Sequence, residues 1–270
     1  MELSILIPIY RFDCSALLGA LEAQCGAEGM EYEILTADDE QLHLGRARIR
    51  NHLADKATGR WLLFIDCDAA VDNAAFIHRY REAANEGSPV ICGGLHHADN
   101  LPSPTVSLRY RYEKAADRHR SAAERSRTPY ARFTPFNFLI QRDTFLSIRF
   151  DESCTGYGHE DTLFGAELER RGIAIQHIDN PLLHTGLEPN EVFLEKTREA
   201  LRNLKQMESQ LAGHSTLLKG YRLLRRFHLQ GATAWLFRHR RTQWERRLTG
   251  SLKPSLRLFQ IYKTGYYAQL

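Results

Sequence analysis

The chain has 270 residues, of which 43% are hydrophobic, 10% aromatic and 26% charged, and this ordinary globular composition excludes a fully disordered chain. The net charge of +3 combines an acidic body with a basic tail: residues 214–270 carry twelve Lys or Arg and one acid, whereas residues 1–213 carry 24 basic and 32 acidic residues. The five cysteines are scattered and never spaced as CxxC, which argues against a disulfide framework or a zinc knuckle and indicates a reducing compartment.

Strand and helix patterns alternate through the first ninety residues. Short apolar runs predict strands over Leu3–Ile9, Tyr32–Ala37, Trp61–Ile65 and Val90–Cys92. Apolar residues at helical spacing predict helices over Ser15–Gln24, Gly45–Ala57 and Ala74–Asn85. This alternation predicts an α/β fold with a mostly parallel sheet flanked by helices.

The middle of the chain is less regular. The charged stretch Ser107–Arg127 is compatible with a helix or with a mobile segment. Beyond it we expect strands over Arg132–Gln141 and Ile173–Ile178, helices over Asp161–Arg171 and Pro189–Leu211, and loops over Asp151–His159 and Asn180–Leu187. We expect one domain over residues 1–213 and a basic helical tail over residues 214–270.

The tail mixes arginines with large apolar side chains over Leu217–Leu229 and Ala234–Leu248. Cationic helices of this kind lie in the interface of an anionic membrane, where each basic residue contributes roughly 1 kcal/mol. A helical hairpin packed on the body is the structural alternative. Nucleic-acid binding is a further one, which the acidic body does not support. The N-terminus lacks a basic n-region, so we expect no signal peptide, and no apolar stretch reaches the roughly 20 residues of a membrane span.

Polar side chains follow three predicted strands, at Pro8 and Tyr10, at Asp38 and Asp39, and at Asp66 and Asp68. In an open α/β sheet, ligands bind beyond the carboxyl ends of the strands. Asp66 follows five bulky apolar residues, so it and Asp68 would repel each other at the edge of the core unless a cation lay between them. Such oxygen ligands suit Mg²⁺ or Mn²⁺ shared with a phosphate, and a solvated turn is the alternative.

The helix expected from Gly45 begins with three arginines, Arg46, Arg48 and Arg50. First-turn amides and guanidinium groups at one helix end suit a diphosphate. A solvated basic helix face is the alternative interpretation.

Five segments, taken in order, resemble the inverting family 2 glycosyltransferases of GT-A fold. They are LSILIPIY (Leu3–Tyr10), EILTADD (Glu33–Asp39), GRARIRN (Gly45–Asn51), ATGRWLLFIDCD (Ala57–Asp68) and GYGHED (Gly156–Asp161). The resemblance is closest to the branch of bacterial chondroitin polymerases and polypeptide N-acetylgalactosaminyltransferases, and it covers about Leu3 to Glu188. The chain departs from the pattern at Tyr157, where the branch usually has Trp, and at His159, where Gly is common.

The resemblance implies a role for each matching residue. Pro8, Tyr10 and Asp39 or Asp38 would hold the uracil base, and Arg50 would help to hold the nucleotide, a role for which Arg46 is a candidate from its place at the start of the helix. Asp68, with Asp66 and His184, would bind Mn²⁺ or Mg²⁺, and Asp66 would also contact the ribose. Asn137 and Tyr157 would line the sugar pocket, Glu160 would contact the sugar or acceptor, and Asp161 would be the general base. For His184 the alternative is a packed core histidine.

Inverting transfer is a single displacement, which needs a carboxylate base on one face of the sugar and positive charge on the departing diphosphate on the other. The resemblance therefore implies transfer of a sugar from a UDP-sugar to a hydroxyl of a bacterial surface glycan. We expect a cytoplasmic enzyme, held by its tail at the inner membrane face. The alternatives are a non-catalytic nucleotide- or carbohydrate-binding scaffold and a nucleic-acid-binding protein.

Overall fold

The computed structural model describes residues 2–154 and 156–270 and divides into two compact units. The first unit comprises Met1–His97, Asp117–Thr155 and Glu160–Gly186, and the second comprises Ala98–Ala116, Gly156–His159 and Leu187–Leu270. This grouping differs from the expected boundary after residue 213, because residues 187–213 belong with the C-terminal helices.

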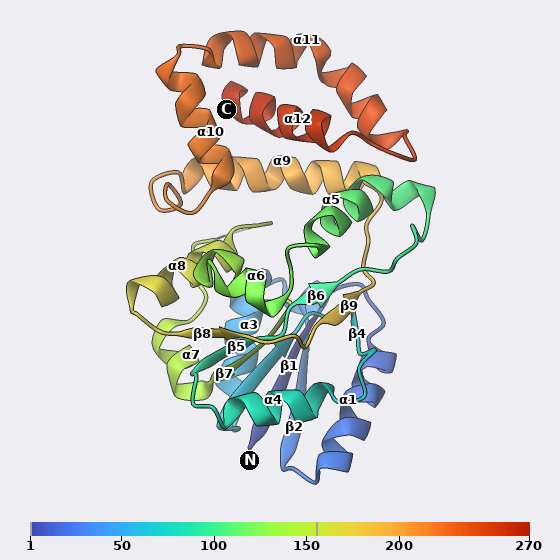
Figure 1. Cartoon of the computed structure of the whole chain (residues 1–270), viewed down its shortest axis with the longest axis vertical. Coiled ribbons are helices and arrows are strands. Elements are labelled where there is room, and N and C mark those ends of the chain that lie inside the picture. Colours follow the sequence, from blue (N-terminus) through green and yellow to red (C-terminus); the bar gives the residue numbers. More distant parts are fainter. Residues whose placement is uncertain (1, 155) are drawn as a thin grey trace. The chain divides into compact units, whose positions relative to one another are not determined.

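The first unit is built on a six-stranded sheet with the order β2-β1-β3-β7-β5-β8 (Figure 1). Its strands are β1 (Leu3–Ile9), β2 (Tyr32–Asp38), β3 (Trp61–Ile65), β5 (Val90–Cys92), β7 (Asn137–Gln141) and β8 (Ile175–His177). β7 pairs antiparallel with both of its neighbours, and every other pair in this sheet is parallel. The mostly parallel mixed sheet predicted from the sequence is confirmed.

Helices cover both faces of this sheet because its central strands are apolar on both sides. On β3, Leu63 packs with the cluster that holds α1 (Ser15–Glu28) and α4 (Phe76–Ala84), and Phe64 packs with the cluster on the other face. The remaining helices of this unit are α2 (Asp39–Leu42), α3 (Arg46–Lys56), α6 (Ala122–Ser126), α7 (Arg142–Ile148) and α8 (Glu160–Arg170), with the 3₁₀ turn η2 (Tyr130–Arg132).

A second, three-stranded sheet has the order β4-β9-β6 (Figure 1). Its strands are β4 (Ala69–Ala70), β9 (Leu182–His184) and β6 (Leu95–His96). β9 pairs antiparallel with β4 and parallel with β6. The loop expected over Asn180–Leu187 is therefore wrong in part, since strands of two or three residues leave no periodicity to detect.

Other predicted elements are present with shifted bounds. The strand expected over Arg132–Gln141 begins only at Asn137, because η2 takes up the residues before Phe133. The stretch Ser107–Arg127 forms α5 (Ser107–Asp117) and then α6, so its helical interpretation is confirmed. None of the five cysteines forms a disulfide among the described residues.

The second unit is helical and has its own core. It contains η1 (Pro104–Val106), most of α5, α9 (Asn190–Gln206), α10 (Thr216–Arg226), α11 (Gln230–Thr249) and α12 (Leu256–Gln269). Phe237, Phe259 and Tyr262 are almost completely buried between these helices. At Gly265 a Cβ atom would lie 2.8 Å from the ring of Phe237, so glycine lets α12 approach α11 closely. The basic helical C-terminal extension is confirmed, and α12 lies within it, beyond the two segments that the sequence analysis singled out.

Among the described residues, no helix is long and apolar enough to cross a membrane.

Candidate functional site

Asp68 and His184 meet in the small sheet of the first unit. The Nε2 atom of His184 lies 3.1 Å from Oδ2 of Asp68, with side-chain exposures of 6% and 25%. The pairing of Ala69 with His184 in β4 and β9 sets this contact, and both the amide and the hydroxyl of Thr185 donate to the Asp68 carbonyl. Gly186 completes the arrangement, since a Cβ there would lie 2.2 Å from Asp68 Oδ2.

These two side chains fit a divalent cation. Adjacent ligands of an octahedral ion with bonds of about 2.1 Å lie about 3 Å apart, which matches the His184–Asp68 separation. A carboxylate oxygen suits Mg²⁺ or Mn²⁺, and an imidazole nitrogen is acceptable to Mn²⁺. The structure brings Asp68 and His184 together, and their role as metal ligands stays a prediction.

His184 also contacts a second histidine. Its Nδ1 atom lies 3.3 Å from Nε2 of His97, and Nδ1 of His97 lies 2.9 Å from Oδ1 of Asp117. The His97 side chain is completely buried, and the Asp117 carboxylate also accepts from the His97 backbone amide at 3.3 Å. Phe136 packs edge-on against His184, with ring centroids 5.3 Å apart.

Asp66 is paired with a cation of the protein itself. Nη2 of Arg50 lies 2.5 Å from Asp66 Oδ1, and the Arg50 side chain is only 3% exposed. A turn closed by the Ala69 amide and the Asp66 carbonyl separates Asp66 from Asp68, so the two side chains do not share the common face of an extended strand. Arg50 therefore balances charge at one oxygen of Asp66, and the metal and ribose roles expected for Asp66 stay predictions.

Glu160 joins the same charge network. Its Oε1 atom lies 4.0 Å from Nη1 of Arg50 and 3.5 Å from Nη1 of Arg46, and Glu160 is 4% exposed. Arg50 Nη1 also donates to the Arg46 carbonyl at 3.0 Å, which fixes the guanidinium against α3. Two of the predicted nucleotide-binding arginines therefore neutralise two carboxylates of the expected site.

The ends of β1 and β2 lie side by side. Pro8 pairs with Ala37, and Ile9 pairs with Asp38. The residues predicted to hold the base, at the ends of β1 and β2, are therefore neighbours in the sheet. Tyr10 is 52% exposed, which leaves its ring accessible to a ligand.

Asp38 and Asp39 both bind backbone amides at this edge. Oδ1 of Asp38 accepts from the Glu40 amide at 2.9 Å, and Oδ1 of Asp39 accepts from the amides of Leu44 and Gly45 at 2.8 and 2.9 Å. These bonds shape the turn into α3, so at least one oxygen of each carboxylate has a structural partner.

Asn137 differs from the expected sugar-pocket residue. It is fully buried, and its Nδ2 atom donates to the carbonyls of Gly94 (3.0 Å) and Asn180 (2.9 Å). Its Oδ1 atom accepts from the Tyr80 hydroxyl at 2.6 Å. The amide joins β7 to the segments after β5 and β8, so we correct its role to a structural one.

The GYGHED segment is divided between the two units. Asp161 lies in the first turn of α8, where its Oδ1 atom accepts from the amide and the hydroxyl of Thr162 at 2.6 and 3.1 Å. Tyr157 belongs to the second unit, where its amide donates to Glu199 of α9 at 2.8 Å and its carbonyl accepts from Asn203 at 3.0 Å.

No protein-family model and no curated protein sequence matches the chain. Among solved structures, mannosyl-3-phosphoglycerate synthase from Rubrobacter xylanophilus matches with a TM-score of 0.51 and 14% identity, over 77% of this chain and 75% of that one. The chain has the GT-A fold.

Two further solved structures are similar to it. S. aureus TarS 1–349 in complex with UDP-GlcNAc matches with a TM-score of 0.48 and 17% identity over 76% of this chain, which spans 66% of the length of TarS 1–349. Mannosyltransferase PcManGT from Pyrobaculum calidifontis in complex with GDP-Man and Mn²⁺ matches with a TM-score of 0.49 and 11% identity, over 77% of this chain and 64% of that one.

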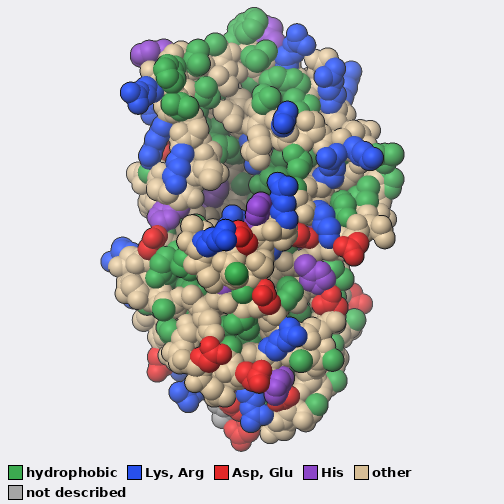
Figure 2. All heavy atoms as spheres, in the orientation of Figure 1, with side chains coloured by type: hydrophobic (Ala, Val, Ile, Leu, Met, Phe, Trp, Pro, Cys, Tyr) green, Lys and Arg blue, Asp and Glu red, His purple; other side chains and the backbone are tan. Residues whose placement is uncertain are grey.

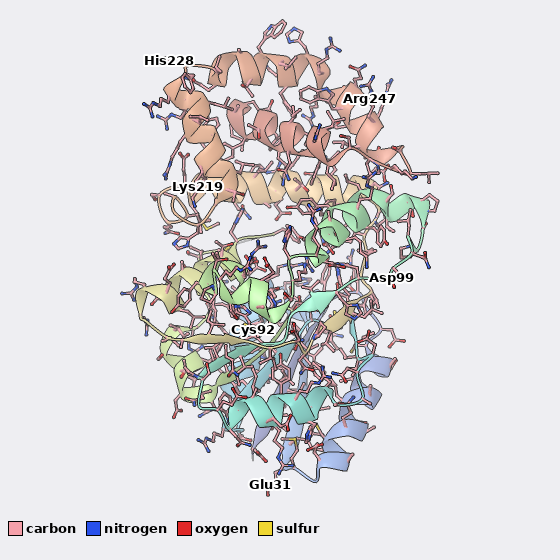
Figure 3. All side chains as sticks on the ribbon, in the orientation of Figure 1. Glu31, Cys92, Asp99, Lys219, His228 and Arg247 are labelled. Carbon is pink, nitrogen blue, oxygen red and sulfur yellow. The ribbon has the colours of Figure 1, made fainter. Side chains whose placement is uncertain are left out.

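Sequence analysis missed several polar residues buried in the GT-A sheet region. Arg125, 4% exposed, donates to the carbonyls of Cys92, Gly93 and Ile178 at 2.9, 3.1 and 2.7 Å. Cys92 lies at the end of β5 within the sheet (Figure 3), where burial raises the pKa of its thiol to about 12. His97 and Asp117 were missed because no spacing rule joins a single histidine to an acid twenty residues later.

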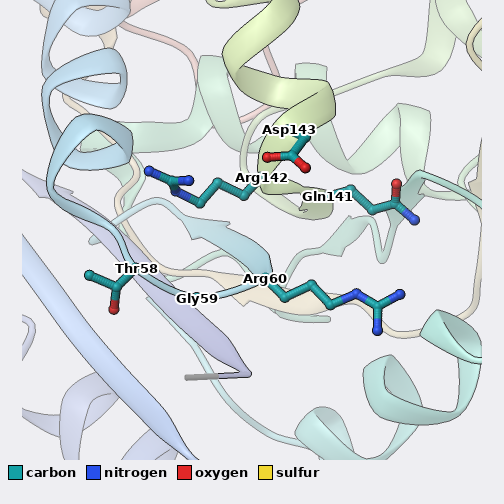
Figure 4. A pocket seen from close by; sticks show the side chains of 6 residues that line it. All are labelled: Thr58, Gly59, Arg60, Gln141, Arg142 and Asp143. Carbon is teal, nitrogen blue, oxygen red and sulfur yellow. The ribbon is translucent and has the colours of Figure 1, made fainter.

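A hollow of about 370 Å³ lies at the start of β3, at the other end of the strand from Asp66 and Asp68 (Figure 4). It is lined by Thr58, Gly59, Arg60, Gln141, Arg142 and Asp143. These residues lie where β3 begins and β7 ends, whereas ligands of an open α/β fold bind where the parallel strands end. We therefore assign the site to the Asp68 end of the sheet.

Proposed function

We propose that this protein is a metal-dependent inverting glycosyltransferase that moves a sugar from a UDP-sugar to a hydroxyl of a glycan acceptor. The acceptor class we propose is a bacterial polysaccharide, capsule or lipopolysaccharide, as the chondroitin-polymerase-like motifs imply. The observation that carries the proposal is the Asp68–His184 pair, held at metal-ligand spacing just beyond β3 of a GT-A sheet. The match to a sugar transferase that shares this fold supports it.

Asp68 and His184 would hold Mn²⁺ or Mg²⁺ against the diphosphate. When bound, the cation supplies the positive charge that a departing diphosphate needs. Pro8 and Tyr10, at the end of β1, provide an accessible surface for the base, and the Tyr10 ring is exposed enough to stack on it. Arg46, with its side chain 42% exposed, is the arginine best placed to reach a phosphate, because Arg50 is buried against Asp66.

Asp161 is the better candidate for the general base than Glu160. Glu160 is buried, and its Oε1 atom already faces the guanidinium groups of Arg46 and Arg50, so it is held by the protein's own cations. In the proposed step, the Asp161 carboxylate takes the proton of the acceptor hydroxyl while the hydroxyl oxygen attacks the anomeric carbon. The bond from that carbon to the diphosphate oxygen breaks on the opposite face, and UDP leaves.

The test is UDP release from a panel of UDP-sugars with Mn²⁺ or Mg²⁺, together with UDP binding by calorimetry. We expect Asp68→Ala to abolish metal-dependent UDP binding and Asp161→Asn to keep UDP binding but lose transfer. Asp72→Asn is the control, because Asp72 is an exposed acid of the same unit that pairs with His96. Protein that neither binds UDP with Mn²⁺ nor releases it from any UDP-sugar would refute the proposal, and UDP binding without turnover would favour the non-catalytic scaffold.

We further propose that the second unit binds an anionic membrane surface at the inner membrane face. The corner where α10 meets α11 exposes large apolar side chains beside basic ones. They are Leu223, Phe227, Leu229, Trp235 and Leu236, with Arg222, Arg225, Arg226 and Arg238. Figure 2 shows blue and green side chains intermixed over the upper part of the view, and Figure 3 labels His228 at the junction of α10 and α11 and Lys219 near the start of α10. Exposed aromatic rings with arginines favour insertion at an anionic interface.

The membrane test uses point variants, because deletion after residue 213 would expose the buried Leu201 and Leu204 of α9. We expect the wild type to sediment with phosphatidylglycerol vesicles but not with phosphatidylcholine vesicles. Phe227→Ser with Trp235→Ser should reduce this binding. Leu252→Ser with Ile261→Ser, two other exposed positions of the same unit, should not. Equal binding by both double variants, or binding of RNA in place of vesicles, would overturn the proposal.

A further inference from the structure

The small sheet brings four polar side chains into one line. From one end to the other they are Asp117, His97, His184 and Asp68, with successive contacts of 2.9, 3.3 and 3.1 Å. Three strands position them: Asp68 precedes β4, His184 ends β9, and His97 follows β6. The parallel pairing of His96 with Leu183 in β6 and β9 places the residues that follow, His97 and His184, side by side.

The acid at one end sets the direction of the hydrogen bonds. An ionised carboxylate can only accept, so Asp117 requires His97 to carry its proton on Nδ1. Neutral His97 then presents the bare Nε2 atom to His184, where it accepts from Nδ1–H. His184 in that tautomer directs the lone pair of its Nε2 atom toward Asp68, as a metal-bound imidazole must.

Packing holds the line in place. The His97 side chain is completely buried and that of His184 is 6% exposed, and the two rings are nearly perpendicular, at 77°, with centroids 5.4 Å apart. The Asp117 side chain is 17% exposed, and Arg120 Nε lies 3.7 Å from its Oδ1 atom, so a positive charge stands beside the carboxylate at this end of the line. Packing restricts both rings to one orientation, and with neutral imidazoles the hydrogen bond from His184 Nδ1–H to His97 leaves the His184 Nε2 lone pair for a cation beside Asp68.

We propose that His97 and Asp117 are positioning residues that fix the tautomer and ring orientation of His184 for a divalent cation held with Asp68. This inference rests on the proposed function, since it concerns the same metal site. Partners of this kind raise metal affinity by 10–100-fold in proteins, without touching the ion.

The test measures Mn²⁺ affinity of the full chain in the presence of UDP, by calorimetry and by the EPR signal of free Mn²⁺. We expect His97→Ala to weaken Mn²⁺ binding 10–100-fold and Asp117→Ala to weaken it less. The double variant should bind no more weakly than His97→Ala, because Asp117 acts only through His97. His97→Gln and Asp117→Asn are milder variants to be used if the alanine variants unfold.

His96→Ala is the matched control. His96 is the neighbouring histidine on β6 and also pairs with an acid, Asp72, at 2.7 Å, but its side chain is 37% exposed and it has no place in the line. We expect its Mn²⁺ affinity to equal that of the wild type.

A spectroscopic readout separates positioning from mere packing. In protein labelled with ¹⁵N-histidine and loaded with Mg²⁺ and UDP, we expect long-range ¹H–¹⁵N spectra to show the Nδ1–H tautomer for both His97 and His184. Asp117→Asn should reduce that tautomer for His97. The opposite tautomer in the wild type would overturn the inference.

The outcomes distinguish the inference from the function on which it rests. If Asp68→Ala loses Mn²⁺ but His97→Ala binds it as the wild type does, the positioning role is wrong and the metal site stands. If His97→Ala loses Mn²⁺ as completely as Asp68→Ala, His97 is a ligand and the positioning role is again wrong. If the wild type itself does not bind Mn²⁺, both the inference and the metal site of the proposed function fail.

Discussion

The guanidinium group of Arg50, on α3, lies 2.5 Å from the carboxylate of Asp66, the first residue after β3. Arg50 is 3% exposed, and it also lies 4.0 Å from the buried carboxylate of Glu160. One buried cation therefore balances two acids at the edge of the core. Without it, both carboxylates would remain partly desolvated and mutually repulsive.

We predict that Arg50→Ala lowers the free energy of unfolding by about 3 kcal/mol, since removing one partner of a buried pair leaves uncompensated charge. Urea unfolding at pH 7 measures this. The matched control is Arg48→Ala on the same helix, because Arg48 and its partner Glu152 are about half exposed and their separation is 3.5 Å. Such a surface pair contributes roughly 0–1 kcal/mol. Equal effects of the two variants would show that the Arg50 pair is not a buried one.

The parallel core could be predicted because each of its strands and helices has a recognisable pattern of apolar residues in the local sequence. Trp61–Ile65 is a continuous apolar run, and the apolar spacing over Gly45–Ala57 is helical, so both elements follow from periodicity alone. The position of Asp68 just after a strand follows from the same apolar run. These features needed no knowledge of contacts between distant segments.

The small sheet could not be predicted, for a physical reason. β4 and β6 have two residues each, which is less than one period of strand alternation, and they exist only because β9 lies between them. The pairing of Asp66 with Arg50 was missed because a turn, and not strand geometry, sets the directions of Asp66 and Asp68. Asn137 was misassigned because its partners come from segments more than 40 residues away.

Asn137→Ala should reduce stability and leave UDP affinity unchanged in the protein that remains folded. The substitution removes hydrogen-bond partners from the carbonyls of Gly94 and Asn180 and from the Tyr80 hydroxyl, and each unsatisfied buried group costs about 1–3 kcal/mol. We therefore expect a loss of at least about 2 kcal/mol in urea unfolding. Asn100→Ala, at an exposed position, is the control. A large loss of UDP affinity with full stability would restore the pocket assignment.

Glu245, the one acid of residues 214–270, organises the second unit. Its Oε1 atom accepts from Nη1 of Arg198 on α9 at 2.8 Å, from Nε of Arg241 at 2.9 Å and from the Tyr262 hydroxyl of α12 at 2.7 Å. Burial, followed by the hydrogen bond to Glu245, raises the pKa of Tyr262 well above its usual range.

We predict that Glu245→Ala destabilises the second unit by about 2–3 kcal/mol, because Arg198 and Tyr262 lose a charged acceptor in a half-buried site. Thermal unfolding followed by the fluorescence of Trp235 and Trp244, both on α11, would report on this unit. Glu191→Ala, at an exposed position of α9, should shift the unfolding midpoint little. Tyr262→Phe should show part of the Glu245→Ala effect. If neither variant changes the unfolding midpoint, the proposed role of Glu245 is wrong.

His177 makes stability depend on pH. Burial, and then the charge of Arg125, lower the pKa of His177 from 6.5 to about 4; its Nδ1 atom accepts from Arg125 at 2.7 Å, and its Nε2 atom donates to the Pro129 carbonyl at 3.1 Å. Between pH 6.5 and 4 the unfolded chain binds a proton that the folded chain does not. The free energy of unfolding therefore falls as the pH falls through this range, by about 3 kcal/mol at most.

We predict that the urea midpoint of the wild type falls more between pH 7 and pH 4.5 than that of His177→Gln, whose side chain does not titrate. His119→Gln, at a half-exposed histidine, should keep the wild-type profile. Parallel profiles for the wild type and His177→Gln would show that His177 is not the group responsible.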